Sequence, residues 1–266
     1  MDDHMRRADI TDRYIHVLGL QRKKPDLAFL SEISSRHVAQ FAFSSVGPRL
    51  GDDLPLDFES LYRRIVTGHR GGYCFEQNGL LFELLKELEF SVSLYLARVI
   101  YNKDVHPGLT HRITLVEIDG ERYIADVGFG PLGPARPVGM SGKESHDGLR
   151  LFRIMQCRSG EFHMQTLQDG EFFSLYKFEL ARYGQADCEL GHFYSHKHPG
   201  ASFVNHLVVS RIMENEIRSL RNREFSIITK SGEKKKPIND AMQLKKILNT
   251  QFDIRVTDAE SSRLFA

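Results

Sequence analysis

The hydrophobic period of this chain changes near residue 90, and that change constrains the fold more than any other feature of the sequence. Before residue 90, apolar residues recur at intervals of three and four, as on one face of an α-helix. From the segment SVSLYLARVIY at 91–101 onward, apolar and polar residues alternate, as they do in a strand. The pattern predicts an α+β fold in which a helical part precedes a β part.

The helical part is predicted to contain four helices. Gly19 and Gly68 end the first and the third, and Asp57 can cap the third. The fourth begins at Cys74 and carries leucines along one side. In order, the predicted helices cover residues 10–18, 27–41, 56–66 and 74–88.

The middle third contains dipeptides that are typical of hairpin turns. They are Asp119-Gly120, Ser159-Gly160 and Asp169-Gly170. Consecutive hairpins of this kind form a small antiparallel barrel or sandwich.

The last third mixes both periods and predicts an α/β cap. The basic run KSGEKKKP at 230–237 is interpreted as a solvated hairpin tip, with anion binding as the alternative. The cap is expected to begin with a strand in FVNHLVVSRI (203–212). A hairpin in EFSIITKSGEKKKPI (224–238) follows and turns at Ser231-Gly232. The last expected element is a helix over 240–250, capped by Asn239 or Asp240.

Charge and cysteine usage exclude several classes of protein. A net charge of +1 argues against a strongly basic surface for nucleic acid. No window approaches the roughly 20 apolar residues of a membrane span, and the N-terminal segment has no apolar run of signal-peptide length. The three cysteines, Cys74, Cys157 and Cys188, do not form a disulfide framework. We therefore expect a cytoplasmic protein without nucleic-acid or membrane partners.

Cys74 lies in the stretch GHRGGYCFEQNGLLFELLKEL, shortly after Gly71 and Gly72. At the first turn of a helix, the macrodipole and unpaired backbone N–H groups favour thiolate over thiol. The two glycines permit a close approach of the backbone and leave space above the sulfur. Position alone does not decide among a packed thiol, a metal ligand and a nucleophile.

A nucleophilic thiol needs a base and a carboxylate that orients the base, and one predicted hairpin supplies both. The segment THRITLVEIDGERYIADVGFG at 110–130 turns at Asp119-Gly120, so opposite residues have numbers that sum to 239. His111 and Asp126 then lie on one apolar face as diagonal neighbours, about 7 to 8 Å apart at the backbone. An aspartate on an apolar face needs such a partner. The hairpin does not by itself place Cys74 beside them.

A second group of residues raises the alternative of a metal site. The stretch CELGHFYSHKH contains four residues of zinc-ligand type, two of which would share a helix face: Cys188, His192, His196 and His198. Phe193, Tyr194 and the Pro199-Gly200 pair instead favour an extended or turning segment. We therefore expect no metal.

Three segments resemble the signature segments of the arylamine N-acetyltransferase family, in the order Cys, His, Asp. They are RGGYCFEQN (70–78), THRITLV (110–116) and YIADVGFG (123–130), and LDFESLYRRIV (56–66) and FYSHKHPGASFVNHLVVSR (193–211) are also similar to family segments. The resemblance implies a helical bundle over 1–90, a central antiparallel β-barrel over 91–190 and an α/β lid over 191–266. It also implies a thiol site like that of the cysteine proteases.

The resemblance implies that Cys74 accepts an acetyl group from acetyl-CoA, with His111 as its base and Asp126 orienting the imidazole. An arylamine, arylhydrazine or N-hydroxyarylamine then attacks acetyl-Cys74, which gives ping-pong kinetics. The implied partners are coenzyme A and a small aromatic amine or hydrazine. The chain is expected to be a monomer or a homodimer.

The resemblance also assigns positions around the thiol. Phe129 aligns with a position that lines the acceptor pocket, and Phe43 and Phe203 are further candidate walls, although each can be ordinary core. The pantetheine arm of CoA is expected to pass three glycines: Gly108, Gly128 and Gly130.

The chain departs from the family pattern at residues 42–45. The family usually carries PFEN there, whereas this chain has AFSS. Ser44 and Ser45 thus replace a glutamate and an asparagine, a change that concerns support of the active site and acceptor preference.

Two rival functions would use the same residues. A thiol hydrolase, protease or transglutaminase-like amide synthase would use the triad with water or another amine. A non-catalytic CoA-binding or scaffold protein would keep the triad without turnover. The acceptor discriminates the family reaction from the first rival, which is favoured if acetyl-CoA never adds an acetyl group to Cys74. The second rival is favoured if Cys74→Ala loses no activity.

Overall fold

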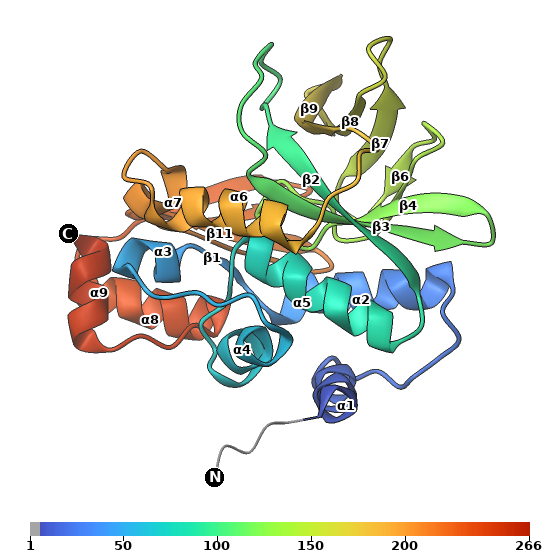
Figure 1. The fold of residues 1–266 in the computed structure, drawn as a ribbon. Helices are drawn as coiled ribbons and strands as arrows, with labels where there is room; N and C mark the ends of the chain where they lie inside the picture. The colour runs from blue at the N-terminus through green and yellow to red at the C-terminus, as the bar shows by residue number, and fades with distance from the viewer. Residues whose placement is uncertain (1–5) are drawn as a thin grey trace.

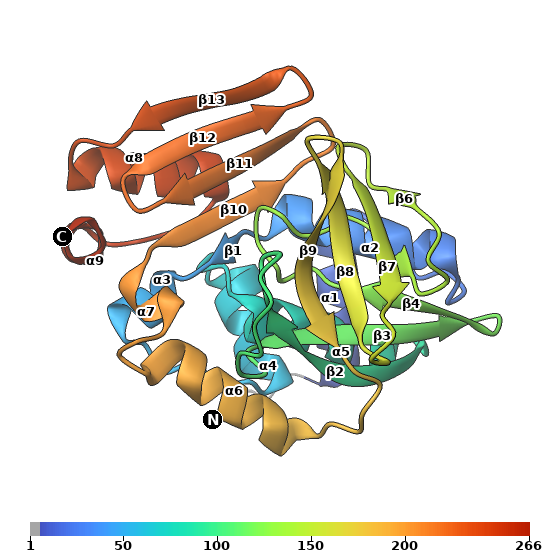
Figure 2. The same cartoon turned by 90° about the horizontal axis from the view of Figure 1, so that it is seen from above.

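The computed structural model describes residues 6–266 and has the predicted order of helices, barrel strands and a mixed C-terminal part (Figure 1). The first five residues of the expected helical part, 1–90, lie outside the described residues. In the view of Figure 1 most helices of this part lie below the barrel, and Figure 2 shows the C-terminal sheet beside the barrel. The expected α+β fold is confirmed.

The helical part contains the four predicted helices and a short one, α3, that the sequence pattern did not predict. Asp57 caps α4 as expected, because its carboxylate accepts a hydrogen bond from Ser60 N at 2.9 Å. The predicted third helix continues as a π-helical turn, η1. The bounds are α1 (Arg7–Val17), α2 (Leu27–Gln40), α3 (Val46–Leu50), α4 (Phe58–Tyr62), η1 (Arg63–Thr67) and α5 (Cys74–Glu87).

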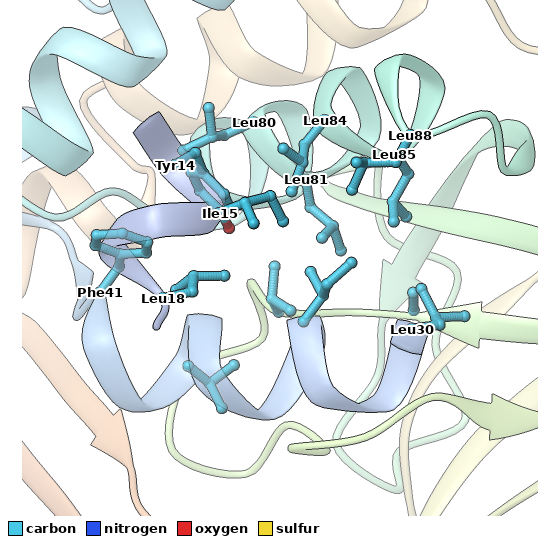
Figure 3. Packing of buried hydrophobic residues seen from close by; sticks show 14 of the residues in the cluster. Tyr14, Ile15, Leu18, Leu30, Phe41, Leu80, Leu81, Leu84, Leu85 and Leu88 are labelled. Carbon is cyan, nitrogen blue, oxygen red and sulfur yellow. The ribbon is translucent and has the colours of Figure 1, made fainter. Parts of the chain in front are cut away.

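The core of the helical part is built on the leucine face of α5. Figure 3 shows this face turned toward α1 and α2. Burial of one leucine side chain stabilises the fold by about 1.5–3 kcal/mol, so the face fixes α5 and the position of its first residue, Cys74. The leucines in this core are Leu80, Leu81, Leu84, Leu85 and Leu88.

A chain of buried polar groups crosses this core. Tyr14 hydrogen-bonds His37 Nδ1, and His37 Nε2 bonds Gln77 Oε1 at 2.7 Å. Gln77 Nε2 in turn donates to the Ala42 carbonyl at 2.7 Å. Burial lowers the pKa of His37 to about 4, so the ring is neutral at pH 7. A neutral ring can accept from Tyr14 and donate to Gln77 at the same time.

Eight strands form an antiparallel sheet that curls into a nearly closed barrel (Figure 2). Their order is β5-β4-β3-β2-β9-β8-β7-β6. Two of the three predicted turns, Asp119-Gly120 and Asp169-Gly170, have positive φ at both residues, as two-residue hairpin turns require. The bounds are β2 (Ser91–Val99), β3 (His111–Ile118), β4 (Glu121–Ala125), β5 (Val138–Gly139), β6 (Ser145–His146), β7 (Leu151–Gln156), β8 (Phe162–Gln168) and β9 (Glu171–Phe178).

Strand β3 is buried on both faces along most of its length. Val116 packs in the core of the helical part, whereas Ile113 and Leu115 pack in the barrel core. The strand therefore forms the boundary between two cores. His111 at its first position lies where the helices and the barrel meet.

The C-terminal part contains a five-stranded antiparallel sheet of order β1-β10-β11-β12-β13. Strand β1 (Phe43–Ser44) comes from the helical part and pairs with β10, so this sheet joins regions that are far apart in the sequence. Asp240 caps α8 by accepting from Gln243 N at 2.7 Å. The other bounds are α6 (Gln185–Lys197), α7 (Ser202–Asn205), β10 (Val208–Ile212), β11 (Glu216–Arg221), β12 (Glu224–Thr229), β13 (Gly232–Pro237), α8 (Ala241–Phe252) and α9 (Asp258–Phe265).

The prediction of an extended segment over 188–198 is wrong, because nearly all of it lies in α6. Polar side chains of this helix face inward while Leu190 and Phe193 are exposed, so hydrophobic periodicity gave no helical signal. The boundary expected between residues 190 and 191 falls inside α6. The inward side chains are Cys188, His192, Ser195 and His196.

The predicted strand over 203–212 is also shorter than expected. Residues 203–205 lie in α7, and the strand begins at Val208. Across residues 6–266, no helix is long and apolar enough to cross a membrane.

We expect acid to destabilise the protein partly through His37. The ordinary pKa of histidine is 6.5, whereas the pKa of His37 in the fold is about 4. Between these values the unfolded state binds a proton that the folded state does not bind. The contribution of His37 to the free energy of unfolding is therefore fully present above about pH 6.5. It decreases as the pH falls, by about 3 kcal/mol at pH 4.

Urea denaturation of the wild type and of His37→Gln at several pH values between 7 and 4 measures this contribution. The glutamine amide keeps hydrogen-bonding groups near Tyr14 and Gln77 but does not titrate. At pH 7 the free energy of unfolding of the variant should be lower than that of the wild type. Between pH 7 and pH 4 it should fall by about 3 kcal/mol less than the wild-type value does. Equal pH slopes for the two proteins contradict the prediction.

Candidate active site

A cavity of about 640 Å³ lies between the start of α5, the barrel and the lid. Its described lining includes both Cys74 and His111, so the fold supplies the spatial link that the hairpin alone could not. All three predicted aromatic positions and one of the three predicted glycines also line it: Phe43, Phe129, Phe203 and Gly128. Gly108 and Gly130 are not among the described residues of this lining.

The hairpin of β3 and β4 has the predicted register. Thr114 lies opposite Ala125 and Ile118 opposite Glu121, so paired numbers sum to 239. His111 Nε2 and Asp126 Oδ2 are 2.8 Å apart, and both side chains are buried. The predicted contact between these two residues is confirmed.

The Asp126 carboxylate is held by further donors. Oδ1 accepts from Asn78 Nδ2 at 2.8 Å and from Gly128 N at 3.0 Å. Burial alone opposes ionisation, but His111 and these donors together hold the pKa of Asp126 below its ordinary value. The aspartate is therefore ionised at neutral pH and can fix the imidazole with Nε2 toward itself and Nδ1 free.

The Cys74 thiol is buried and donates to the Thr110 carbonyl, with 3.5 Å between sulfur and oxygen. Burial raises the pKa of this thiol, and the charge of Asp126 adds to the rise, whereas the backbone N–H groups of Arg112 and Phe75 oppose it. The expectation that a helix start favours the thiolate is therefore outweighed by desolvation. Ionisation of Cys74 requires a base.

The first turn of α5 carries three consecutive buried polar residues, Glu76, Gln77 and Asn78. Glu76 accepts from Tyr73 N at 3.1 Å and pairs with Arg64 at 2.7 Å. Gln77 belongs to the polar chain across the helical core. Each side chain therefore ties the residues after the cysteine to a different part of the molecule.

Asn78 is a site residue to which the sequence argument gave no role. Besides Asp126, its Nδ2 donates to the Arg112 carbonyl at 2.6 Å, and its Oδ1 accepts from Val127 N at 2.9 Å. A signal was present in the sequence, because Asn78 lies three and seven residues before Leu81 and Leu85 and therefore falls on the leucine face of the helix.

Tyr73 and His192 form a second contact that the sequence did not reveal. Tyr73 Oη hydrogen-bonds His192 Nδ1 at 2.5 Å, and His192 Nε2 donates to the Leu54 carbonyl at 2.8 Å. Burial lowers the pKa of His192 to about 4, so the ring is neutral and can accept from the tyrosine. The residue before Cys74 is thereby anchored to α6, a contact that the incorrect prediction for 188–198 concealed.

Aromatic rings form much of the cavity wall. The ring of Phe129 lies edge-on to His111 with centroids 5.1 Å apart, and Tyr101 lies 5.8 Å from Phe129. The rings of Phe43 and Phe203, which also line the cavity, are 5.6 Å apart. Such walls suit a flat aromatic ligand.

The glycines differ in what surrounds them. A Cβ at Gly128 would lie 2.8 Å from Cys74 Cα and 2.7 Å from Asn78 Nδ2, so the absence of a side chain there lets the barrel touch the cysteine backbone. Gly130 has φ of +87° and packs on Phe43. A Cβ at Gly108 would meet only Thr110 Cγ2, at 3.6 Å.

The AFSS segment supports the site through its own contacts. Ser45 Oγ donates to the His206 carbonyl at 2.9 Å and accepts from Val208 N at 2.8 Å, which joins β1 to the lid. Ser44 N donates to the Gly72 carbonyl at 2.8 Å. The loop before Cys74 is therefore held by backbone pairing with the segment that departs from the family pattern.

The histidines of α6 do not assemble a metal centre. His192 and His196 stack with centroids 4.1 Å apart, but His196 Nδ1 bonds the His192 carbonyl. Within residues 6–266 there is no group of three or more His, Cys, Asp or Glu side chains placed to hold a metal ion.

Comparisons with known proteins agree with this fold. A family model described as N-acetyltransferase matches residues 26–261. The arylamine N-acetyltransferase of Mycolicibacterium smegmatis is 31% identical over 257 residues, which cover 92% of each protein. The solved enzyme of that name from Salmonella typhimurium is 27% identical with a TM-score of 0.92, over 98% of this chain and 99% of that one. The Mycobacterium marinum enzyme, solved in complex with CoA, is 26% identical with a TM-score of 0.88, over 94% of this chain and 97% of that one.

The fold and these matches define an acyltransferase. The chain belongs to the arylamine N-acetyltransferase family. The family expected from the three sequence segments is therefore confirmed.

Substitution of Gly128 should disturb the site, whereas substitution of Gly108 should not. In Gly128→Ala the new methyl group meets the backbone of Cys74, and such overpacking costs about 1–3 kcal/mol. We expect a lower melting temperature and a loss of acetyl transfer. Gly108→Ala is the matched control, because its Cβ makes only ordinary contact. Equal melting temperatures for the two variants contradict this account.

Proposed function

We propose that this chain transfers an acetyl group from acetyl-CoA to arylamines, arylhydrazines or N-hydroxyarylamines by a ping-pong mechanism through acetyl-Cys74. The observation that carries the proposal is the 2.8 Å contact between His111 and Asp126, in a cavity that Cys74 also lines. A relative with CoA bound supports acetyl-CoA as the donor. The names of the relatives support an arylamine acceptor.

In the first half-reaction His111 Nδ1 takes the Cys74 proton. The sulfur then attacks the acetyl carbonyl, and a tetrahedral intermediate forms. Collapse of the intermediate breaks the bond to the CoA sulfur, which leaves with the proton from His111. Backbone N–H groups at the start of α5, that of Cys74 among them, are suited to stabilise the oxyanion, because the first N–H groups of a helix lack partners within it.

In the second half-reaction the neutral amine attacks the thioester carbonyl of acetyl-Cys74. His111 accepts the amine proton, and collapse of the second intermediate breaks the bond to the Cys74 sulfur. The proton returns to the thiol, so the enzyme is regenerated. The aromatic walls contributed by Phe129 and Tyr101 suit a flat acceptor beside the thioester.

A thiol hydrolase or transglutaminase-like reaction is the alternative use of the same three residues. It differs in the acyl acceptor, which would be water or another amine. The aromatic wall near His111 favours an aromatic acceptor over a peptide. Discharge of acetyl-Cys74 by a panel of amines, with water as the reference, separates these reactions.

Acetylation of Cys74 is the direct test of the covalent intermediate. Intact-protein mass spectrometry after incubation with acetyl-CoA should show one added acetyl group, which an arylamine or a hydrazine then removes. Cys74→Ala should remain unmodified and should have lost transfer. Cys157→Ala and Cys188→Ala are the controls and should keep most activity; equal losses in all three variants would exclude Cys74 as the carrier.

Asp126→Asn should slow acetylation of Cys74 by about 10³- to 10⁴-fold, as in other triads. The asparagine can donate its amide proton to His111 Nε2, and the imidazole then keeps its proton on Nδ1. In that tautomer Nδ1 cannot accept the thiol proton. Stopped-flow acetylation rates for both proteins measure the effect, with circular dichroism to verify that the variant folds. A rate close to that of the wild type would remove Asp126 from the mechanism.

A further inference from the structure

One charged side chain in the cavity has no part in the proposed acyl transfer. Among the described lining residues, Arg221 is the only one with a fixed charge, and no carboxylate lines the cavity beside it. The remainder is mainly aromatic, aliphatic and hydroxyl-bearing. A cation at the edge of an aromatic cavity is a feature that can select among ligands.

Arg221 is the last residue of β11 and lies on the strand face that borders the cavity. Ser219, two residues earlier on the same face, also lines the cavity, as does Val208, which lies opposite Arg221 on β10. The strand pairing therefore fixes the base of the side chain. Only the guanidinium end is free to adjust to a ligand.

The neighbours of Arg221 leave its guanidinium available. Glu224 lies opposite Arg221 on β12, but the Glu224 carboxylate pairs with Lys235 at 2.9 Å. Within residues 6–266 the Arg221 guanidinium has no hydrogen bond or ion pair of its own. It can therefore bind an anion without first breaking a salt bridge.

Aromatic contacts connect the reacting groups to this cation. The ring of Phe129 contacts His111, and Tyr101 contacts Phe129 in turn. Tyr101 and Arg221 both line this cavity. An aromatic acceptor along Phe129 and Tyr101, with its amine at Cys74, would direct its far end toward Arg221.

We propose that Arg221 is a specificity-determining residue that binds an anionic group, a carboxylate or a sulfonate, on the acceptor ring across from the amine. The inference rests on the proposed function. Guanidinium groups bind carboxylates through two parallel hydrogen bonds, which also fixes the orientation of the ring. The phosphates of CoA are the other anion available, but the neutral pantetheine arm separates them from the thioester at Cys74.

The test compares p-aminobenzoate with its neutral analogue p-aminobenzamide in the wild type and in Arg221→Gln. p-Nitrophenyl acetate serves as the donor, because it lacks phosphate groups. In the variant, kcat/KM for p-aminobenzoate should fall by about tenfold while that for the amide changes by less than about twofold. Arg36→Gln removes an equal charge from the exposed face of α2 and should alter neither value.

A change at Glu224 should act in the opposite direction. Glu224→Gln removes the carboxylate that faces Arg221 across the strands. It should raise kcat/KM for p-aminobenzoate without a matching rise for the amide. Ligand-observed NMR of both acceptors with unacetylated protein should show the same preference and its loss in Arg221→Gln.

The remaining outcomes overturn the inference in distinguishable ways. If Arg221→Gln lowers kcat/KM equally for both acceptors, the residue supports the fold. If the substitution leaves kcat/KM for both acceptors unchanged and raises KM for acetyl-CoA, the guanidinium binds a CoA phosphate. If the wild type acetylates neither these two acceptors nor any other amine or hydrazine tested, the proposed function fails, and the NMR comparison still decides whether Arg221 binds the carboxylate.

Discussion

The structure depends on the burial of three consecutive polar side chains, Glu76, Gln77 and Asn78, which begin two residues after the cysteine. A buried polar group without a partner costs about 1–3 kcal/mol, so each of the three must meet its own partner. Those partners lie in different parts of the molecule: an arginine on η1, a histidine on α2, and an aspartate beyond β4. The start of α5 can satisfy all three only in one position.

That position explains why the cysteine lies where three parts of the fold meet. Asn78 joins α5 to the hairpin of β3 and β4, and Gly128 lets the same hairpin contact the Cys74 backbone. The hydrogen bond between Tyr73 and His192 connects the residue before the cysteine to the lid helix α6. A reactive group held in this way from the helices, the barrel and the lid has little freedom to move, which is the condition for catalysis by positioning.

The parts of the fold that sequence could predict are those that local rules determine. Spacing of apolar residues located α1, α2 and α5, and turn chemistry at Asp119-Gly120 set the register that joins His111 to Asp126. Helix α6 was missed because its buried stripe contains histidines while Leu190 is exposed. The partners of Asn78 and His192 were missed because they depend on how distant elements pack. Neither spacing nor propensity carries that information, and the family resemblance supplied it for the triad and for several positions of the cavity wall but not for Asn78 or His192.

The burial that positions the cysteine also changes its chemistry. Desolvation raises the pKa of Cys74 although a helix start favours the thiolate, so the sulfur is held as a thiol at neutral pH. A thiol resists oxidation better than a thiolate does. In the proposed mechanism reactivity then depends on transfer of the proton to His111, which Asp126 orients, and Asp126 is itself held by Asn78. Helix α5 thus carries both the nucleophile and a support of the base that activates it, so a displacement of this helix would impair both functions together.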